Sequence, residues 1–160
     1  MKILVLSDSH SALRLMRDCI DSVKPDAVVH LGDYYDDGAA MAEEYPHIRM
    51  YQVPGNCDRY RVPFGVPETL VEKVCGVKLM MTHGHIHRVK WGLGALIADA
   101  RTTGVQGVLF GHTHESYCEC VEGLWVINPG SCGYGGGSGA VITVEDGKIS
   151  DCRIIRQSDL

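Results

Sequence analysis

The feature that most constrains this chain is a series of five polar clusters, most of which directly follow a hydrophobic run. In chain order the clusters are Asp8-Ser9-His10, Gly32-Asp33-Tyr34-Tyr35-Asp36, Gly55-Asn56-Cys57-Asp58, His83-Gly84-His85 and Gly111-His112-Thr113-His114. Among their side chains are two carboxylates, those of Asp8 and Asp33, together with an amide and at least four imidazoles, a ligand set for a pair of transition-metal ions. Because the ends of strands meet at one edge of an open α/β sheet, we expect the clusters to converge there.

The hydrophobic runs in the first third of the chain predict parallel strands joined by helices. Apolar residues are continuous over much of 2–7 and 26–31, which is typical of strands, and 47–53 is expected to be a third strand that ends at Pro54. Apolar residues at helical spacing predict a helix over 11–23, and a shorter helix is expected over 38–44. The order strand, helix, strand, helix, strand favours helical crossovers between parallel strands.

The rest of the chain predicts hairpins around one further helix. The segments 69–74 and 77–81 predict a hairpin that leads into the His83 cluster. Helical spacing predicts a helix over 89–103, and a further buried strand is expected over 105–110. Four more strands, paired through tight turns, are expected at 116–121, 124–127, 140–144 and 148–155.

The composition is that of an ordinary globular protein. With 160 residues, 45% hydrophobic and 22% charged, the chain fits one domain, 1–160, with a full core. A formal charge of −5 and the lack of a basic run argue against nucleic-acid binding through phosphate neutralisation. The first apolar run is too short for a signal peptide, and no segment approaches the ~20 apolar residues of a membrane helix. We therefore expect a cytoplasmic protein with no membrane partner.

The cysteine content also favours a location in the cytoplasm. Seven cysteines make an odd count without a secretory context, so we expect reduced thiols. Cys118 and Cys120 form the only close pair, and their spacing puts both side chains on one face of a strand. Core packing is the simpler interpretation of this pair, and metal or redox chemistry is the alternative.

Taken in order, the five clusters resemble the signatures of the calcineurin-like binuclear metallophosphoesterases. The later segment Asn128-Pro129-Gly130-Ser131 resembles one found in the small bacterial and archaeal phosphodiesterases of that family. The resemblance runs from residue 2 to about residue 144. It implies a four-layer αββα sandwich with two mixed central sheets and a metal site at the carboxyl ends of the strands.

The resemblance also implies a ligand set for two divalent metal ions. It assigns one metal to Asp8, His10, Asp33 and His114. It assigns the other metal to Asp33, Asn56, His83 and His112, so that Asp33 bridges the two. The mixture of carboxylate, amide and imidazole groups favours Mn²⁺ and also suits Ni²⁺, Fe²⁺, Zn²⁺ or Co²⁺.

Such a site predicts a phosphoesterase, most naturally a phosphodiesterase, acting on a small phosphate ester. Two neighbouring ions would lower the pKa of a shared water, and the resulting hydroxide would attack phosphorus in line. Asn56 could donate its amide hydrogens to the phosphate. The ions outweigh the charge of Asp8 and Asp33, so we expect the pocket to attract anions although the protein is acidic.

One position departs from the family pattern. Many members carry a histidine after the motif asparagine, placed to protonate the leaving group, and here that residue is Cys57. Asp58, His85 and metal-bound water are the remaining candidates for this role. We therefore expect faster hydrolysis of aryl than of alkyl phosphodiesters.

Several residues keep two interpretations. Asp36 is expected to orient a ligand or cap a helix, and His85 either touches substrate or lies outside the reaction. Arg59 and Arg61 either bind a substrate phosphate or belong to a solvated loop. The glycine-rich segment 133–139 either cradles a phosphate or is a flexible loop.

The competing function is a non-catalytic scaffold of the same fold. The resemblance includes a retromer scaffold subunit in which several ligand positions are altered. Scaffold-type members lose the histidine of the first motif or the bridging aspartate, whereas this chain keeps His10 and Asp33. The sequence therefore favours the enzyme, and it leaves self-association open.

Overall fold

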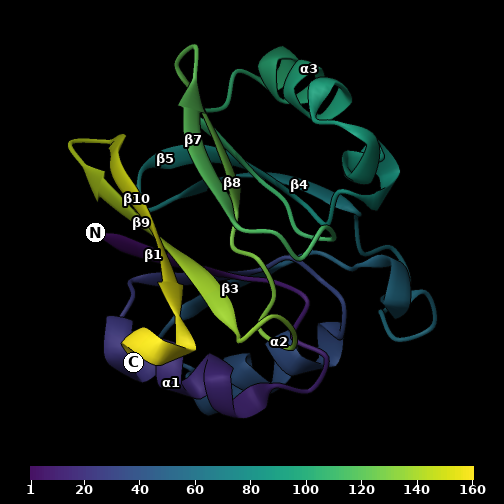
Figure 1. Ribbon diagram of the computed structural model, residues 1–160, viewed down its shortest axis with the longest axis vertical. Helices are drawn as coiled ribbons and strands as arrows, with labels where there is room; N and C mark the ends of the chain where they lie inside the picture. The colour runs from purple at the N-terminus through teal and green to yellow at the C-terminus, as the bar shows by residue number, and fades with distance from the viewer.

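Two mixed five-stranded sheets form the centre of the computed structural model, which describes residues 1–160 (Figure 1). Their strand orders are β10-β9-β1-β2-β3 and β4-β5-β6-β8-β7. The first sheet consists of β1 (Lys2–Leu6), β2 (Ala27–His30), β3 (Arg49–Gln52), β9 (Ser138–Glu145) and β10 (Lys148–Arg156). The second consists of β4 (Thr69–Val74), β5 (Val77–Thr82), β6 (Gly107–Leu109), β7 (Tyr117–Val121) and β8 (Leu124–Asn128).

Helices cover the outer face of each sheet. α1 (Leu13–Val23) and α2 (Tyr35–Glu44) pack on the first sheet, and α3 (Gly94–Thr103) packs on the second, at the opposite end of Figure 1. This arrangement confirms the expected four-layer αββα sandwich with two mixed central sheets. None of the helices combines the length and the apolar character that crossing a membrane requires.

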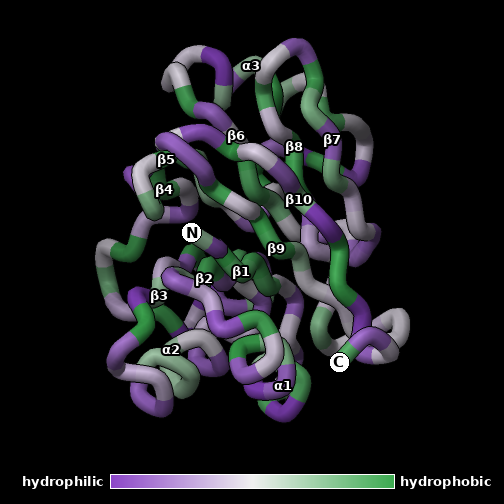
Figure 2. Tube along the Cα trace, turned by 90° about the vertical axis from the view of Figure 1, so that its left-hand side faces the viewer, coloured by the Kyte–Doolittle hydropathy of each residue, from purple (hydrophilic) through white to green (hydrophobic).

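The strand β1 shows why the predicted strands are apolar at every position. Ile3 and Val5 join the core between the two sheets, whereas Leu4 and Leu6 pack with Met16 beneath α1. Successive side chains of a strand point to opposite faces, so a strand covered on both sides needs apolar residues throughout. Figure 2 shows this as hydrophobic stretches along β1, β2 and β9, with hydrophilic residues concentrated in the outer segments.

Parallel pairing brings distant loops to one edge of the sandwich. β1 pairs with β2 and β2 with β3 in parallel, as the strand–helix order predicted. In the second sheet, β6 pairs in parallel with both β5 and β8. The three predicted hairpins, β4–β5, β7–β8 and β9–β10, are confirmed by antiparallel pairing. The loops that follow the parallel strands therefore leave each sheet at its carboxyl edge.

All three helix starts differ from the prediction: α2 begins at Tyr35, earlier than the expected residue 38, and the other two helices begin late because the backbone leaves the helical region. The helix expected over 89–103 begins only at Gly94, and Val89–Trp91 forms a separate 3-10 turn. Gly92 separates the two with a φ of 147°, which only glycine adopts readily. The helix expected from residue 11 begins at Leu13, because Ser11 has a φ of 70°.

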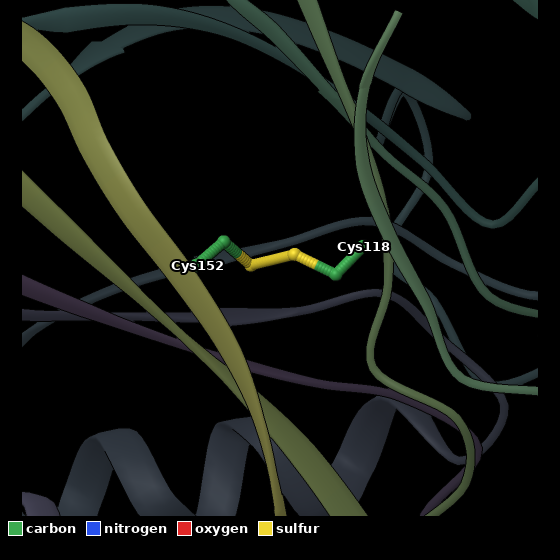
Figure 3. The surroundings of a disulfide bond; sticks show 2 residues. All are labelled: Cys118 and Cys152. Carbon is green, nitrogen blue, oxygen red and sulfur yellow. A yellow bond between two sulfur atoms is a disulfide. The ribbon is translucent and has the colours of Figure 1, made fainter.

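The expectation that all cysteines are reduced is wrong for two of them. Cys118 on β7 and Cys152 on β10 form a disulfide bond, with their Cα atoms 6.5 Å apart (Figure 3). These strands are edge strands of different sheets, so the bond links the two sheets covalently. Only sheet packing brings residues 34 positions apart into contact, which is why sequence spacing did not indicate the pair. Cys120, the other member of the close pair, is free and exposed.

Reduction of this disulfide is expected to lower the free energy of unfolding by about 4 kcal/mol, since a loop of this length is no longer closed in the unfolded chain. The measurement is urea unfolding with and without reductant for the wild type and Cys152→Ser. The wild-type midpoint should fall with reductant to near that of the variant, whose midpoint should not respond. A reductant-insensitive wild-type midpoint would contradict the prediction.

Candidate metal centre

The predicted ligands converge where the loops after β1, β2, β3, β5 and β6 meet. The structure contains two groups of three potential ligands. Within each group, the donor atoms all lie within 4.8 Å of one another. The first group is Asp8, His10 and His114, and within it Nε2 of His114 lies 3.1 Å from Oδ1 of Asp8. The second group is Asp8, Asp33 and His83. The two groups share Asp8, so they lie side by side.

Asp33 connects the two sides of the cluster through its two carboxylate oxygens. Oδ2 lies 3.8 Å from Nε2 of His10, and Oδ1 lies 3.6 Å from Nε2 of His83. Nε2 of His10 is buried without a hydrogen-bond partner, which is costly for a polar atom unless a ligand uses it. These donor types and the unpartnered nitrogen fit a divalent metal site.

Hydrogen bonds behind the cluster orient its ligand atoms. Nδ1 of His83 lies 2.7 Å from the carbonyl oxygen of Leu31, so this nitrogen carries the proton and Nε2 presents its lone pair to the cluster. Oδ2 of Asp8 accepts from the Ser7 hydroxyl and from the backbone N–H of His112. Oδ1 of Asp8 is thereby left facing His114.

The remaining two predicted ligands lie beside the second group. Oδ1 of Asn56 is 3.1 Å from Nε2 of His83. The rings of His112 and His83 have centroids 5.0 Å apart. All seven predicted ligands thus lie in one cluster, although five separate segments of the chain carry them.

Strained backbone is concentrated at these residues. Non-glycine residues with positive φ are uncommon because the Cβ atom is crowded, and they typically cost 1–3 kcal/mol each. Five predicted ligands have this conformation: Asp8 (φ 51°), His10 (43°), Asp33 (55°), His112 (69°) and His114 (61°). Strain of this kind persists where the surrounding structure enforces it, as at ligand-binding sites.

The local pKa values favour ligand forms at neutral pH. Burial, followed by His83 and Lys90, lowers the pKa of His112 to about 4, so its ring is uncharged. Burial alone would raise the pKa of Asp33, but His83, the Cys57 N–H and His10 outweigh it and lower that pKa. Partial burial and Asp33 raise the pKa of the Cys57 thiol to about 11, which keeps it protonated.

Asp58 has a different environment from the one expected of a proton donor. Its side chain is fully buried, and its two oxygens accept four backbone N–H groups. The donors are Asp33, Tyr34, Tyr35 and Gly55. The carboxylate therefore holds the loop after β2 against the loop after β3, and its oxygens are not free to serve a leaving group.

His85 lies next to the cluster, at the wall of a cavity. Its Nε2 is 3.3 Å from a carboxylate oxygen of Glu68, and its ring centroid is 5.5 Å from that of His83. Arg59 and Asn56 line the same cavity. Arg61 instead lies with its guanidinium 4.6 Å from the ring centre of Tyr34.

Asp36 does not cap α2, because the N-cap residue is Tyr34 and has no side-chain cap bond. The neighbouring Asp37, which the sequence did not single out for the site, holds the first loop. Its Oδ2 accepts from the Ser9 hydroxyl at 2.7 Å and from the Ser11 N–H at 2.8 Å. Only the position of these serines in space, and not their spacing, shows this contact.

Tyr134 is another residue that sequence reasoning missed. Its ring stacks on His114, with centroids 5.2 Å apart and an interplanar angle of 12°, and meets His10 edge-on at 4.9 Å. The signal was its position as the lone aromatic residue in the glycine-rich segment 133–139. The Ser131 hydroxyl anchors this segment, because it donates to the carbonyl of Asp8 and accepts the Tyr134 N–H.

The fold and the site together define a class: αββα proteins with carboxylate and imidazole ligands at the carboxyl ends of their strands. The chain belongs to the calcineurin-like phosphoesterase superfamily, whose domain model matches residues 1–147. Members of this family use divalent metals, and the cluster described above supplies candidate ligands.

Individual relatives agree with this assignment. The probable metallophosphoesterase YsnB of Bacillus subtilis is 30% identical over 134 residues, covering 82% of this chain and 75% of the relative. Phosphodiesterase MJ0936 of Methanocaldococcus jannaschii is 28% identical over 147 residues, covering 82% and 84%.

Solved structures share the fold. A conserved predicted phosphoesterase of Streptococcus pneumoniae superposes with a TM-score of 0.72 at 25% identity, covering 98% of this chain and 97% of the other. Wild-type Vps29 of Entamoeba histolytica, complexed with Zn²⁺, superposes with a TM-score of 0.71 at 23% identity, covering 98% and 99%. The similarity to Vps29 concerns the fold alone.

Proposed function

We propose that this protein is a binuclear metal-dependent phosphodiesterase that acts on a small phosphate ester. The observation that carries the proposal is the position of Asp33, whose two oxygens face His10 on one side and His83 on the other. A carboxylate in this position can serve two ions at once. The name of the archaeal relative, a phosphodiesterase, supports the diester as the substrate class.

The proposed ligands are those implied by the resemblance. Asp8, His10, Asp33 and His114 would hold one ion, and Asp33, Asn56, His83 and His112 would hold the other. When bound, the two ions would supply an activated water and neutralise the negative charge that develops on the phosphate. A ligand set without thiolates favours Mn²⁺, with Ni²⁺, Fe²⁺, Zn²⁺ and Co²⁺ as alternatives.

The roles of the other predicted catalytic residues follow from their contacts. We assign Asn56 and His85 to substrate contact, because both line the cavity beside the cluster. Asp58 is assigned to positioning, since its oxygens are engaged by backbone N–H groups. The Cys57 thiol is a weak acid and the Asp58 oxygens are engaged, so His85 and metal-bound water remain the candidates for protonating the leaving group. This is consistent with the expected preference for aryl esters.

The scaffold alternative is supported only by the shared fold with Vps29. The strained backbone at the predicted ligands and the unpartnered His10 nitrogen support a metal site, and the Zn²⁺ complex of Vps29 is compatible with such a site in a protein of the same fold. Hydrolysis is favoured by the phosphoesterase family to which the chain belongs and by the phosphodiesterase among its relatives.

Removal and return of metal tests the proposal. We expect chelator treatment to lower hydrolysis of bis(p-nitrophenyl) phosphate by at least about 100-fold, because the attacking water is no longer activated. Mn²⁺, Ni²⁺, Zn²⁺ and Mg²⁺ are then restored separately, and p-nitrophenyl phosphate is assayed in parallel. Mn²⁺ should restore the diester activity. Absence of hydrolysis with every metal, although calorimetry detects metal binding, would refute the enzyme and favour the scaffold.

A further inference from the structure

A cavity of about 480 Å³ opens beside the metal centre, and it is lined by Asn56 and His85, which are assigned above to substrate contact. The residues that matter for its chemistry are Asn56, Arg59, Val62, Val66, Glu68 and His85. Its volume falls within the range of small-molecule sites in proteins. A cavity of similar size, about 510 Å³, lies near the carboxyl ends of α1 and α2 and contains none of the predicted ligands.

Asn56 connects this cavity to the metal centre. Its side chain lines the cavity, and its Oδ1 is 3.1 Å from Nε2 of the predicted ligand His83. A phosphate group bound at the cluster would therefore have this cavity within reach of one of its substituents. A phosphodiester has a second organic substituent that needs space beyond that of the leaving group, and a phosphomonoester has none.

We propose that this cavity is a specificity subsite for a nucleoside-sized second substituent of a phosphodiester, an inference that rests on the proposed function. Val62 and Val66 offer an apolar wall for a planar base. The pair formed by Glu68 and His85, 3.3 Å apart, offers a hydrogen-bond acceptor and a donor for hydroxyl or amide groups. Arg59 adds a cation at the same wall.

The mixture of groups distinguishes this substituent from simpler ones. A methyl group would fill little of the cavity and would satisfy none of its polar side chains. A purely hydrocarbon substituent would leave Glu68, His85 and Arg59 without partners when it displaced their water. A nucleoside presents both an apolar ring face and several hydroxyl and amide groups, so it matches both parts of the wall.

The test compares two diesters with the same leaving group, thymidine 5′-(p-nitrophenyl phosphate) and methyl p-nitrophenyl phosphate, on the Mn²⁺-loaded protein. We expect kcat/KM to favour the thymidine ester by at least about tenfold, mostly through a lower KM. In Val66→Trp, where the new side chain fills the cavity, the ratio should fall to within about twofold of unity. The matched control is Val71→Trp, an exposed valine on β4 outside this cavity, which should keep the wild-type ratio.

The outcomes separate the two proposals. If the wild type hydrolyses both esters with equal kcat/KM, or if Val66→Trp folds and keeps the thymidine preference, the subsite is refuted and the enzyme stands. If Val66→Trp does not fold, two other measurements decide: the ratio of kcat/KM for the two esters in the wild type, and the same ratio in Val62→Phe. If neither ester is hydrolysed with any metal, the proposed function itself has failed.

Discussion

Asp33→Asn is expected to reduce metal-dependent hydrolysis of bis(p-nitrophenyl) phosphate by at least about 1000-fold, because it removes the charge and one of the two oxygens of the proposed bridging ligand. The amide nitrogen of asparagine carries hydrogens and cannot face a metal ion. The remaining oxygen can still accept the Cys57 N–H that Asp33 Oδ1 accepts at 2.9 Å, so the fold should persist. The measurements are kcat/KM after Mn²⁺ loading and the metal content per chain, which should fall as well.

A matched variant separates this effect from the general loss of an aspartate beside a histidine. Asp99 on α3 lies 2.9 Å from Nε2 of His87, outside the predicted ligand cluster. Asp99→Asn should therefore leave kcat/KM and metal content close to those of the wild type. Asp33→Asn with activity within about tenfold of the wild type would contradict the bridging role.

Gly55→Ala is expected to lower activity about 100-fold and weaken Mn²⁺ binding, since small displacements of reacting groups have effects of this size. Gly55 has an ordinary φ of −98°, so backbone strain is not the cause. The added Cβ atom would lie 2.1 Å from Oδ1 of Asp33 and 2.5 Å from its backbone nitrogen. Either the loop after β3 or the carboxylate must move. Calorimetric titration with Mn²⁺ and kcat/KM for the diester measure the effect.

The control for this substitution is Gly94→Ala at the start of α3. A Cβ atom there has no neighbour within 4 Å, and alanine favours a helix. Its activity and metal affinity should match the wild type. Equal Mn²⁺ affinity in Gly55→Ala and the wild type would show that the close approach to Asp33 does not position the carboxylate.

Much of the fold was predictable from the sequence because it depends on local patterns. The strand β1 could be predicted because both of its faces are covered, which requires apolar residues throughout. The hairpins could be predicted from their tight turns. The start of α3 could not be predicted. The helical spacing of apolar residues continues across Gly92, although the positive φ of Gly92 interrupts the helix there. Hydrophobic spacing reports which face is buried and is insensitive to one residue that turns the backbone.

The sequence by itself indicated the candidate ligands and the segments that carry them, because five ordered polar clusters resemble the signatures of one family. Only the tertiary structure decided how the loops are held. Asp58 binds two loops together through backbone N–H groups, Tyr134 stacks on His114, and Cys118 bonds to Cys152 across the two sheets. Each of these contacts joins segments distant in the chain, and their approach is set by the packing of whole strands and helices, which residue spacing does not encode.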